Sequence, residues 1–89
     1  MPHALPQLSE RPSTETLKQA LKGRDSASEA YFYDFVALVY EQMGLSRELF
    51  ARQVGAKPKT VDIWLGRKGH FPSGARLERL LELYEANRG

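Results

Sequence analysis

Residues 45–72 constrain the fold of this 89-residue chain most, because their pattern suits two short helices joined by a tight turn. Leu45-Ser46 precede the first helix, and the serine hydroxyl is placed to accept a hydrogen bond from a free amide of the first turn. Gly55 stands where the turn needs a left-handed residue. Pro58 then opens the second helix, where its missing N–H group breaks no hydrogen bond. The segment therefore predicts two helices that pack across a turn.

Each of these two helices is expected to have one apolar face. The inward residues are Phe50, Ala51 and Val54 in the first helix and Val61, Trp64 and Leu65 in the second. The outward face of the second helix is Lys59, Asp62, Ile63 and Gly66, spaced at i, i+3, i+4 and i+7. That face is narrow, mostly short-chained and basic at its N-terminal end, which is what a helix in the DNA major groove requires.

Residues 32–84 resemble the Cro/lambda-repressor-like family of helix-turn-helix regulators, also called the xenobiotic-response-element family. The residues that carry the resemblance are Leu45-Ser46, Phe50-Ala51, Gly55, Thr60-Val61, Trp64 and Pro72-Ser73. A helix with periodic apolar residues follows them. The resemblance implies an all-α fold, a compact bundle of about five helices that contains a helix-turn-helix DNA-binding domain.

Three further helices are expected around this segment, each from a capping residue followed by apolar residues at helical spacing. They span residues 16–22 after a cap at Ser13 or Thr14, residues 28–43 with Ser28 as the cap, and residues 72–87 from Pro72-Ser73 onward. The chain then divides into an N-terminal arm with a short helix, residues 1–27, and the helix-turn-helix DNA-binding domain, residues 28–89.

The helix expected at residues 28–43 carries more apolar surface than one core face needs. Its core stripe is Phe32, Val36, Val39 and Met43. Tyr31, Phe35 and Leu38 form a second stripe beside it, and a patch of this kind needs a cover. Two covers are available: the chain's own helix with Leu17 and Leu21, or the same surface of a second subunit. The first is the favoured packing partner.

Positive charge is concentrated in the second half of the chain. Residues 1–45 hold four basic and six acidic side chains, net −2, whereas residues 46–89 hold nine basic and five acidic ones, net +4. A polyanionic partner explains this asymmetry most simply, although a solvated basic face remains the alternative. The chain has no cysteine and no apolar run long enough for a signal peptide or a membrane span, so we expect a cytoplasmic protein without a membrane partner.

The resemblance also implies a set of DNA-binding residues. They are Arg47, Lys57, Lys59, Thr60, Asp62, Ile63, Arg67, Lys68 and His70. Arg47 and Thr60 are expected at phosphates, and Lys59 can donate to guanine. Asp62 can accept from cytosine or instead orient Lys59 or an arginine, and Ile63 can contact a thymine methyl group. Arg67, Lys68 and His70 follow the second helix of the motif, called the recognition helix, and are expected to bind the DNA backbone.

Two residues depart from the family pattern. Lys57 replaces the serine or threonine usual as the cap of the recognition helix, and Ile63 stands where relatives often carry a hydrogen-bonding base reader. Ile63 keeps open a reading in which this face binds protein. We expect no enzyme, no cofactor and no metal site, because no nucleophile–base pair, phosphate loop, acidic cluster or ligand spacing is present.

Together these features predict a small repressor that acts as a homodimer. Two copies would place their recognition helices in successive major grooves, about 34 Å apart, on a palindromic operator of double-stranded DNA. One alternative is an antitoxin-type interaction protein that binds a toxin through residues 1–27 and autoregulates its operon. Another is an excisionase-like factor of a phage, whose output is DNA bending.

Overall fold

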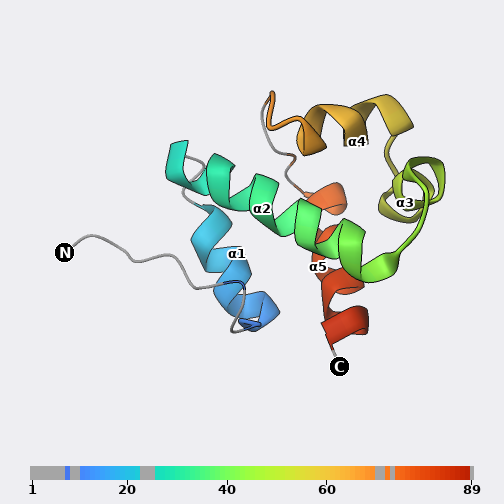
Figure 1. The fold of residues 1–89 in the computed structure, drawn as a ribbon. Helices are drawn as coiled ribbons and strands as arrows, with labels where there is room; N and C mark the ends of the chain where they lie inside the picture. Colours follow the sequence, from blue (N-terminus) through green and yellow to red (C-terminus); the bar gives the residue numbers. More distant parts are fainter. Residues whose placement is uncertain (1–7, 9–10, 23–25, 70–71, 73, 89) are drawn as a thin grey trace.

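The computed structural model describes residues 8, 11–22, 26–69, 72 and 74–88. These residues form five helices and no strand: α1 Thr14–Lys22, α2 Ser26–Met43, α3 Arg47–Val54, α4 Pro58–Leu65 and α5 Ala75–Arg88. The prediction of a compact all-α bundle of about five helices is confirmed (Figure 1). In this part of the chain, no helix is both long and apolar enough to cross a membrane.

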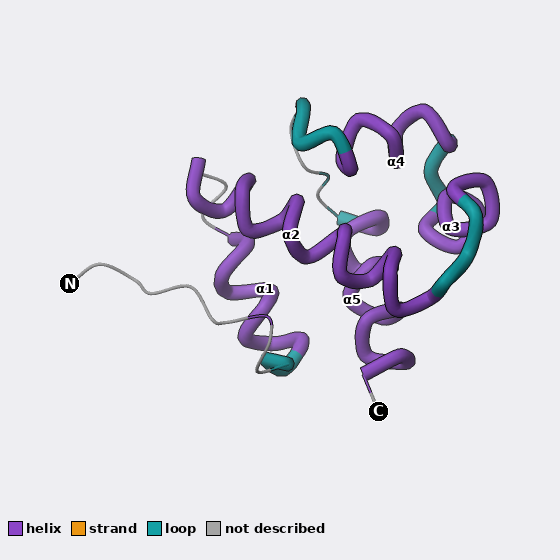
Figure 2. The backbone as a smooth tube through the Cα atoms, in the orientation of Figure 1, coloured by secondary structure: helices purple, strands orange, loops and turns teal. Residues whose placement is uncertain are grey.

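Helix α2 is the central element of the bundle. It packs against α1, α4 and α5, while α3 packs against α4 and α5 (Figures 1 and 2). Two edge-to-face aromatic pairs fix these contacts: Phe32 meets Trp64 of α4 at 5.6 Å between ring centroids, and Phe35 meets Tyr84 of α5 at 5.4 Å. The indole of Trp64 is therefore a core group, as its position in the apolar stripe predicted.

Two helices begin earlier than predicted. Helix α1 begins at Thr14, two residues early, because the Ser13 Oγ accepts a hydrogen bond from the Thr16 amide at 3.2 Å. Helix α2 begins at Ser26, so the boundary expected after residue 27 falls inside its first turn. The prediction that Ser28 caps α2 is wrong. Its side chain is buried, and its hydroxyl donates to the Ala20 carbonyl of α1 at 2.9 Å.

The last helix begins later than predicted. Pro72-Ser73 were expected to open it, but α5 starts at Ala75. Gly74 precedes it with φ +68°, and the Glu78 amide donates to the Gly74 carbonyl at 3.0 Å, closing the first helical turn. Of the residues expected on the inner face of α5, Leu80, Leu81 and Tyr84 are buried and Leu77 is half-buried.

The chain itself covers the second apolar stripe of α2. Leu17 and Leu21 of α1 are fully buried in one cluster with Tyr31 and Phe35, and α1 packs against both α2 and α5. The Tyr84 hydroxyl also donates to the Pro12 carbonyl at 2.8 Å, which fixes the start of α1 against α5. The favoured cover, the chain's own helix, is confirmed.

Replacing Leu17 by alanine tests this docking of α1. Leu17→Ala should lower the free energy of unfolding by about 2–5 kcal/mol, because it leaves a cavity in the shared core. Urea titration and thermal melting measure the change. Lys18→Ala is the matched control, since Lys18 is exposed on the same turn. Equal stability of the two variants would contradict a docked α1.

Tyr31 should give the fold a specific alkaline sensitivity. Its hydroxyl is buried and, among the described residues, has no hydrogen-bond partner. Burial raises the pKa of this phenol to about 12, and the nearby Tyr84 adds to the effect. A raised pKa in the folded state means that stability is present below the ordinary value near 10 and is lost as pH rises toward 12.

Tyr31→Phe keeps the packing and removes the unpaired hydroxyl. We expect it to raise the free energy of unfolding by about 1 kcal/mol at pH 7. It should also flatten the loss of stability between pH 10 and pH 12, measured by urea unfolding at each pH. Tyr40→Phe serves as the control on the same helix. If both variants lose stability with pH alike, the assignment to Tyr31 is wrong.

Candidate nucleic-acid interface

Helix α3 begins and ends with local backbone features that the sequence predicted. The Ser46 Oγ accepts from the Leu49 amide at 3.3 Å and caps α3. Gly55 adopts φ +81°, and its amide donates to the Ala51 carbonyl at 2.9 Å. An L-residue with a side chain is strained at this φ, which explains the glycine. Both predictions, the cap and the left-handed turn, are confirmed.

Helix α4 begins without a side-chain cap. Lys57 occupies the capping position, makes no side-chain hydrogen bond there and is followed by Pro58 in the first turn. Its carbonyl accepts from the amides of Thr60 at 2.9 Å and Val61 at 3.2 Å. The helix is therefore held by its first-turn backbone bonds and by the burial of its inner face rather than by a cap.

The two faces of α4 divide as predicted except at Leu65, which was expected inward and is half-buried. Val61 and Trp64 are buried, whereas Lys59, Asp62, Ile63 and Gly66 are all exposed. The Ile63 side chain is 40% exposed. On α3, Leu49 is 45% exposed, and these two are the large apolar residues left open to solvent in the described part of the chain. Sequence reasoning missed Leu49, although inward Phe50, Ala51 and Val54 already place it on the outer side.

An ion pair joins the start of α3 to the outer face of α4. The Arg47 guanidinium donates to the Asp62 carboxylate, and both side chains are about half exposed, at 57% and 47%. The hydrogen bond and charge of Asp62 raise the pKa of Arg47 above its usual value. Of the roles left open for Asp62, this contact matches the one in which it orients an arginine.

A second ion pair holds the segment that follows α4. Arg67, in a left-handed conformation with φ +59°, donates to the Asp34 carboxylate of α2 at 2.7 Å. Its guanidinium carbon lies 5.7 Å from the centre of the Tyr33 ring. The Tyr33 hydroxyl in turn donates to the Gly69 carbonyl. Burial raises the pKa of this phenol, Glu29 adds to the rise and the charge of Arg67 opposes it.

Asp34 and Tyr33 were not among the predicted site residues. They lie 33 and 36 positions before the groups that they bind. A signal was present in the sequence, since Asp34 is the one charged residue between Glu29 and Glu41 in an otherwise apolar stretch. These two residues place a carboxylate and an aromatic ring beside the segment that leaves α4.

The lysines around α4 have a different environment from the arginines. Lys57, Lys59 and Lys68 are exposed, and none forms an ion pair within the described residues. Thr60 is half-buried, and the Lys68 amide donates to the Ile63 carbonyl at 3.0 Å. His70, the remaining predicted residue, lies outside the described residues.

The surface around α4 thus combines several hydrogen-bond donors with two exposed apolar side chains, Ile63 on α4 and Leu49 on α3. Its cationic groups can bind phosphate oxygens, and Ile63 can make apolar contact with a flat or methylated surface. No protein-family model, curated protein or solved structure matches this chain. A functional assignment therefore rests on the residues and on this geometry.

Proposed function

We propose that this protein is a sequence-specific DNA-binding transcriptional regulator in which α3 and α4 act as a helix-turn-helix. The observation that carries the proposal is the outer face of α4, where Lys59, Asp62 and Ile63 are exposed on a helix anchored by buried Val61 and Trp64. A helix presented in this way can enter the major groove and read base edges.

The residues around α4 divide between base contacts and phosphate contacts. Lys59 would donate to guanine O6 or N7, and Ile63 would contact a thymine methyl group. Arg47 and Lys68, at the start of α3 and after α4, would bind phosphates on either side of the groove. Arg67 would reach the same backbone once it leaves Asp34.

The regulator is proposed to act as a homodimeric repressor on a palindromic operator. Two copies would place their α4 helices in successive major grooves, about 34 Å apart, and would exclude polymerase by occupying the promoter. An antitoxin would have to bind its toxin through residues 1–27. The apolar face of α1 in that segment is already buried against α2 and α5, which favours the repressor over this alternative.

The direct test is binding of the purified protein to duplex DNA. A mobility shift with the DNA upstream of its own gene, in excess nonspecific competitor, should give a discrete complex of dimer stoichiometry. Selection of bound duplexes from a random pool should yield a site with two-fold symmetry. A pool that shows no enrichment would contradict sequence-specific binding, whichever promoter the protein controls.

Substitutions on α4 should separate base contacts from phosphate contacts. Lys59→Ala and Ile63→Ala should each relax preference at one base position of the selected site, by roughly 1–3 kcal/mol. Lys68→Ala, the control, should weaken binding to all sequences alike and lower the salt slope by about one unit. Competition binding against single-base variants of the site measures both effects. Unchanged specificity in both α4 variants would contradict their role as base readers.

Asp62 should limit nonspecific binding by competing with phosphate for Arg47. Asp62→Asn would release the guanidinium, and we expect it to tighten binding to random-sequence duplex several-fold at low salt with a steeper salt dependence. The fold should be little affected, because the ion pair is exposed. Glu48→Gln is the matched control. Glu48 is next to Arg47 in the sequence and makes no ion pair in the described structure, so this substitution removes one negative charge without releasing Arg47. Equal tightening by both variants would show a net-charge effect alone.

A further inference from the structure

We propose that the groove between the end of α3 and the start of α5 is an anion site that binds a phosphate group. The groove has a volume of about 440 Å³. It is lined by Arg52, Gln53, Val54, Gly55, Ala75, Arg76 and Arg79. Three of these residues are arginines and none is acidic. None of the three belongs to the DNA-binding residues predicted above, so the site goes beyond the proposed function.

Two of the three positive charges around this groove are not balanced by their immediate surroundings. Arg52 and Arg76 are exposed, and neither makes an ion pair or a side-chain hydrogen bond in the described structure. Arg52 lies in the last turn of α3, where a cation is favourable, but Arg76 lies in the first turn of α5, where the helix dipole opposes one. Helix stability therefore does not explain Arg76, whereas a bound anion would offset both the dipole and the mutual repulsion.

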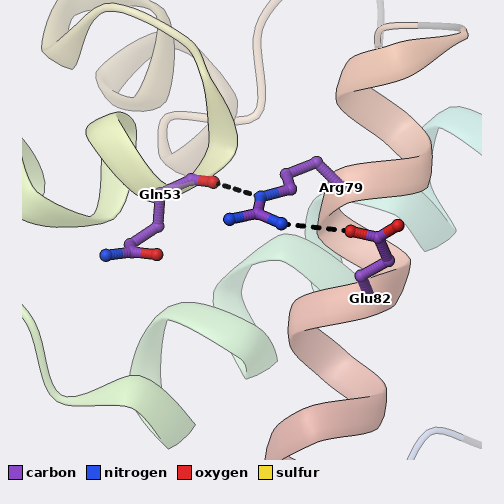
Figure 3. A network of polar contacts seen from close by, with 3 residues as sticks. All are labelled: Gln53, Arg79 and Glu82. Carbon is purple, nitrogen blue, oxygen red and sulfur yellow. Dashed lines mark hydrogen bonds and ion pairs between the residues drawn. The ribbon is translucent and has the colours of Figure 1, made fainter.

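Arg79 is held in place at the edge of the groove (Figure 3). Its Nε donates to the Gln53 carbonyl of α3 at 2.8 Å, and its Nη1 donates to the Glu82 carboxylate at 3.1 Å. These contacts fix the guanidinium between the two helices and leave its other N–H groups without a partner among the described residues. A guanidinium fixed in advance loses little conformational freedom when it binds a ligand.

The chemistry of the groove favours phosphate over other anions. Guanidinium groups bind phosphate oxygens in a bidentate geometry, and a group with three acceptor oxygens can engage several of them at once. Arg52 and Arg76 without an ion-pair partner, beside Arg79 paired with Glu82, also match a doubly charged group better than a single carboxylate. The phosphate can come from a DNA backbone or from a small phosphorylated molecule, and the two sources share this recognition.

Thermal melting in inorganic phosphate tests the site without DNA. At constant ionic strength, replacing chloride with saturating phosphate should raise the Tm of the wild-type protein by about 3–6 °C, because the ligand binds the folded state. Arg76→Gln and Arg52→Gln should each lose most of this shift. Lys59→Gln is the matched control, since it removes one exposed positive charge from α4 outside the groove. An NMR titration of the wild-type protein should show changes centred on the amides of Arg52, Gly55 and Arg76.

The outcomes separate this inference from the proposed function. No shift above chloride, or an equal shift in all four proteins, would overturn the anion site whether or not the protein binds DNA. Loss of the shift in Lys59→Gln alone would overturn it too, by placing the phosphate on α4. With the site supported, a lower salt slope for duplex binding by Arg76→Gln identifies a DNA phosphodiester as its ligand. Unchanged duplex binding excludes a DNA phosphodiester at this site and leaves a small phosphorylated molecule as its ligand.

Discussion

The aromatic packing of α2 is the interaction on which the rest of the structure depends. Phe32 contacts Trp64 of α4, and Phe35 contacts Tyr84 of α5, so one helix fixes the positions of two others. Each edge-to-face pair adds roughly 0.5–1.5 kcal/mol to the burial of the rings themselves. Because Trp64 is held from inside, the opposite side of α4 must face solvent. The exposure of Ile63 is therefore a consequence of the core and not of the turn that precedes α4.

The same turn of α2 also makes polar contacts with the segment that follows α4. Successive residues of a helix point about 100° apart, so Asp34 faces solvent while the ring of Tyr33 stays buried beside Phe32. Tyr33 and Asp34 bind the Gly69 carbonyl and the Arg67 guanidinium, which fixes the segment that follows α4. One turn of α2 therefore positions α4 in two ways. Phe32 holds the inner face of α4 in the core, and Tyr33 and Asp34 hold the segment that follows α4.

Sequence patterns predicted what short-range geometry determines. The Ser46 cap, the left-handed Gly55 and the two faces of α4 depend on residues within a few positions of one another, and all were found apart from the half-buried Leu65. The Ser28 cap failed because that hydroxyl binds a carbonyl of another helix, eight residues away. The Arg47–Asp62 contact was one of several roles left open for Asp62, and nothing in the sequence chose among them. Arg67–Asp34 depends on how helices distant in sequence come together, and no local periodicity encodes that.

A count of charges along the sequence does not show which arginines are paired with carboxylates, and the structure does. Near α4, Asp62 and Asp34 each bind an arginine, so the attraction of this face for a polyanion is partly offset at short range. In the groove between α3 and α5, Arg79 binds Glu82, but Arg52 and Arg76 make no ion pair in the described structure. Exposed pairs are screened by salt and weak in water, so they can open when a phosphate competes for the arginine. On the α4 face a phosphate must displace a carboxylate from each paired arginine, whereas in the groove Arg52 and Arg76 can bind a phosphate without such an exchange.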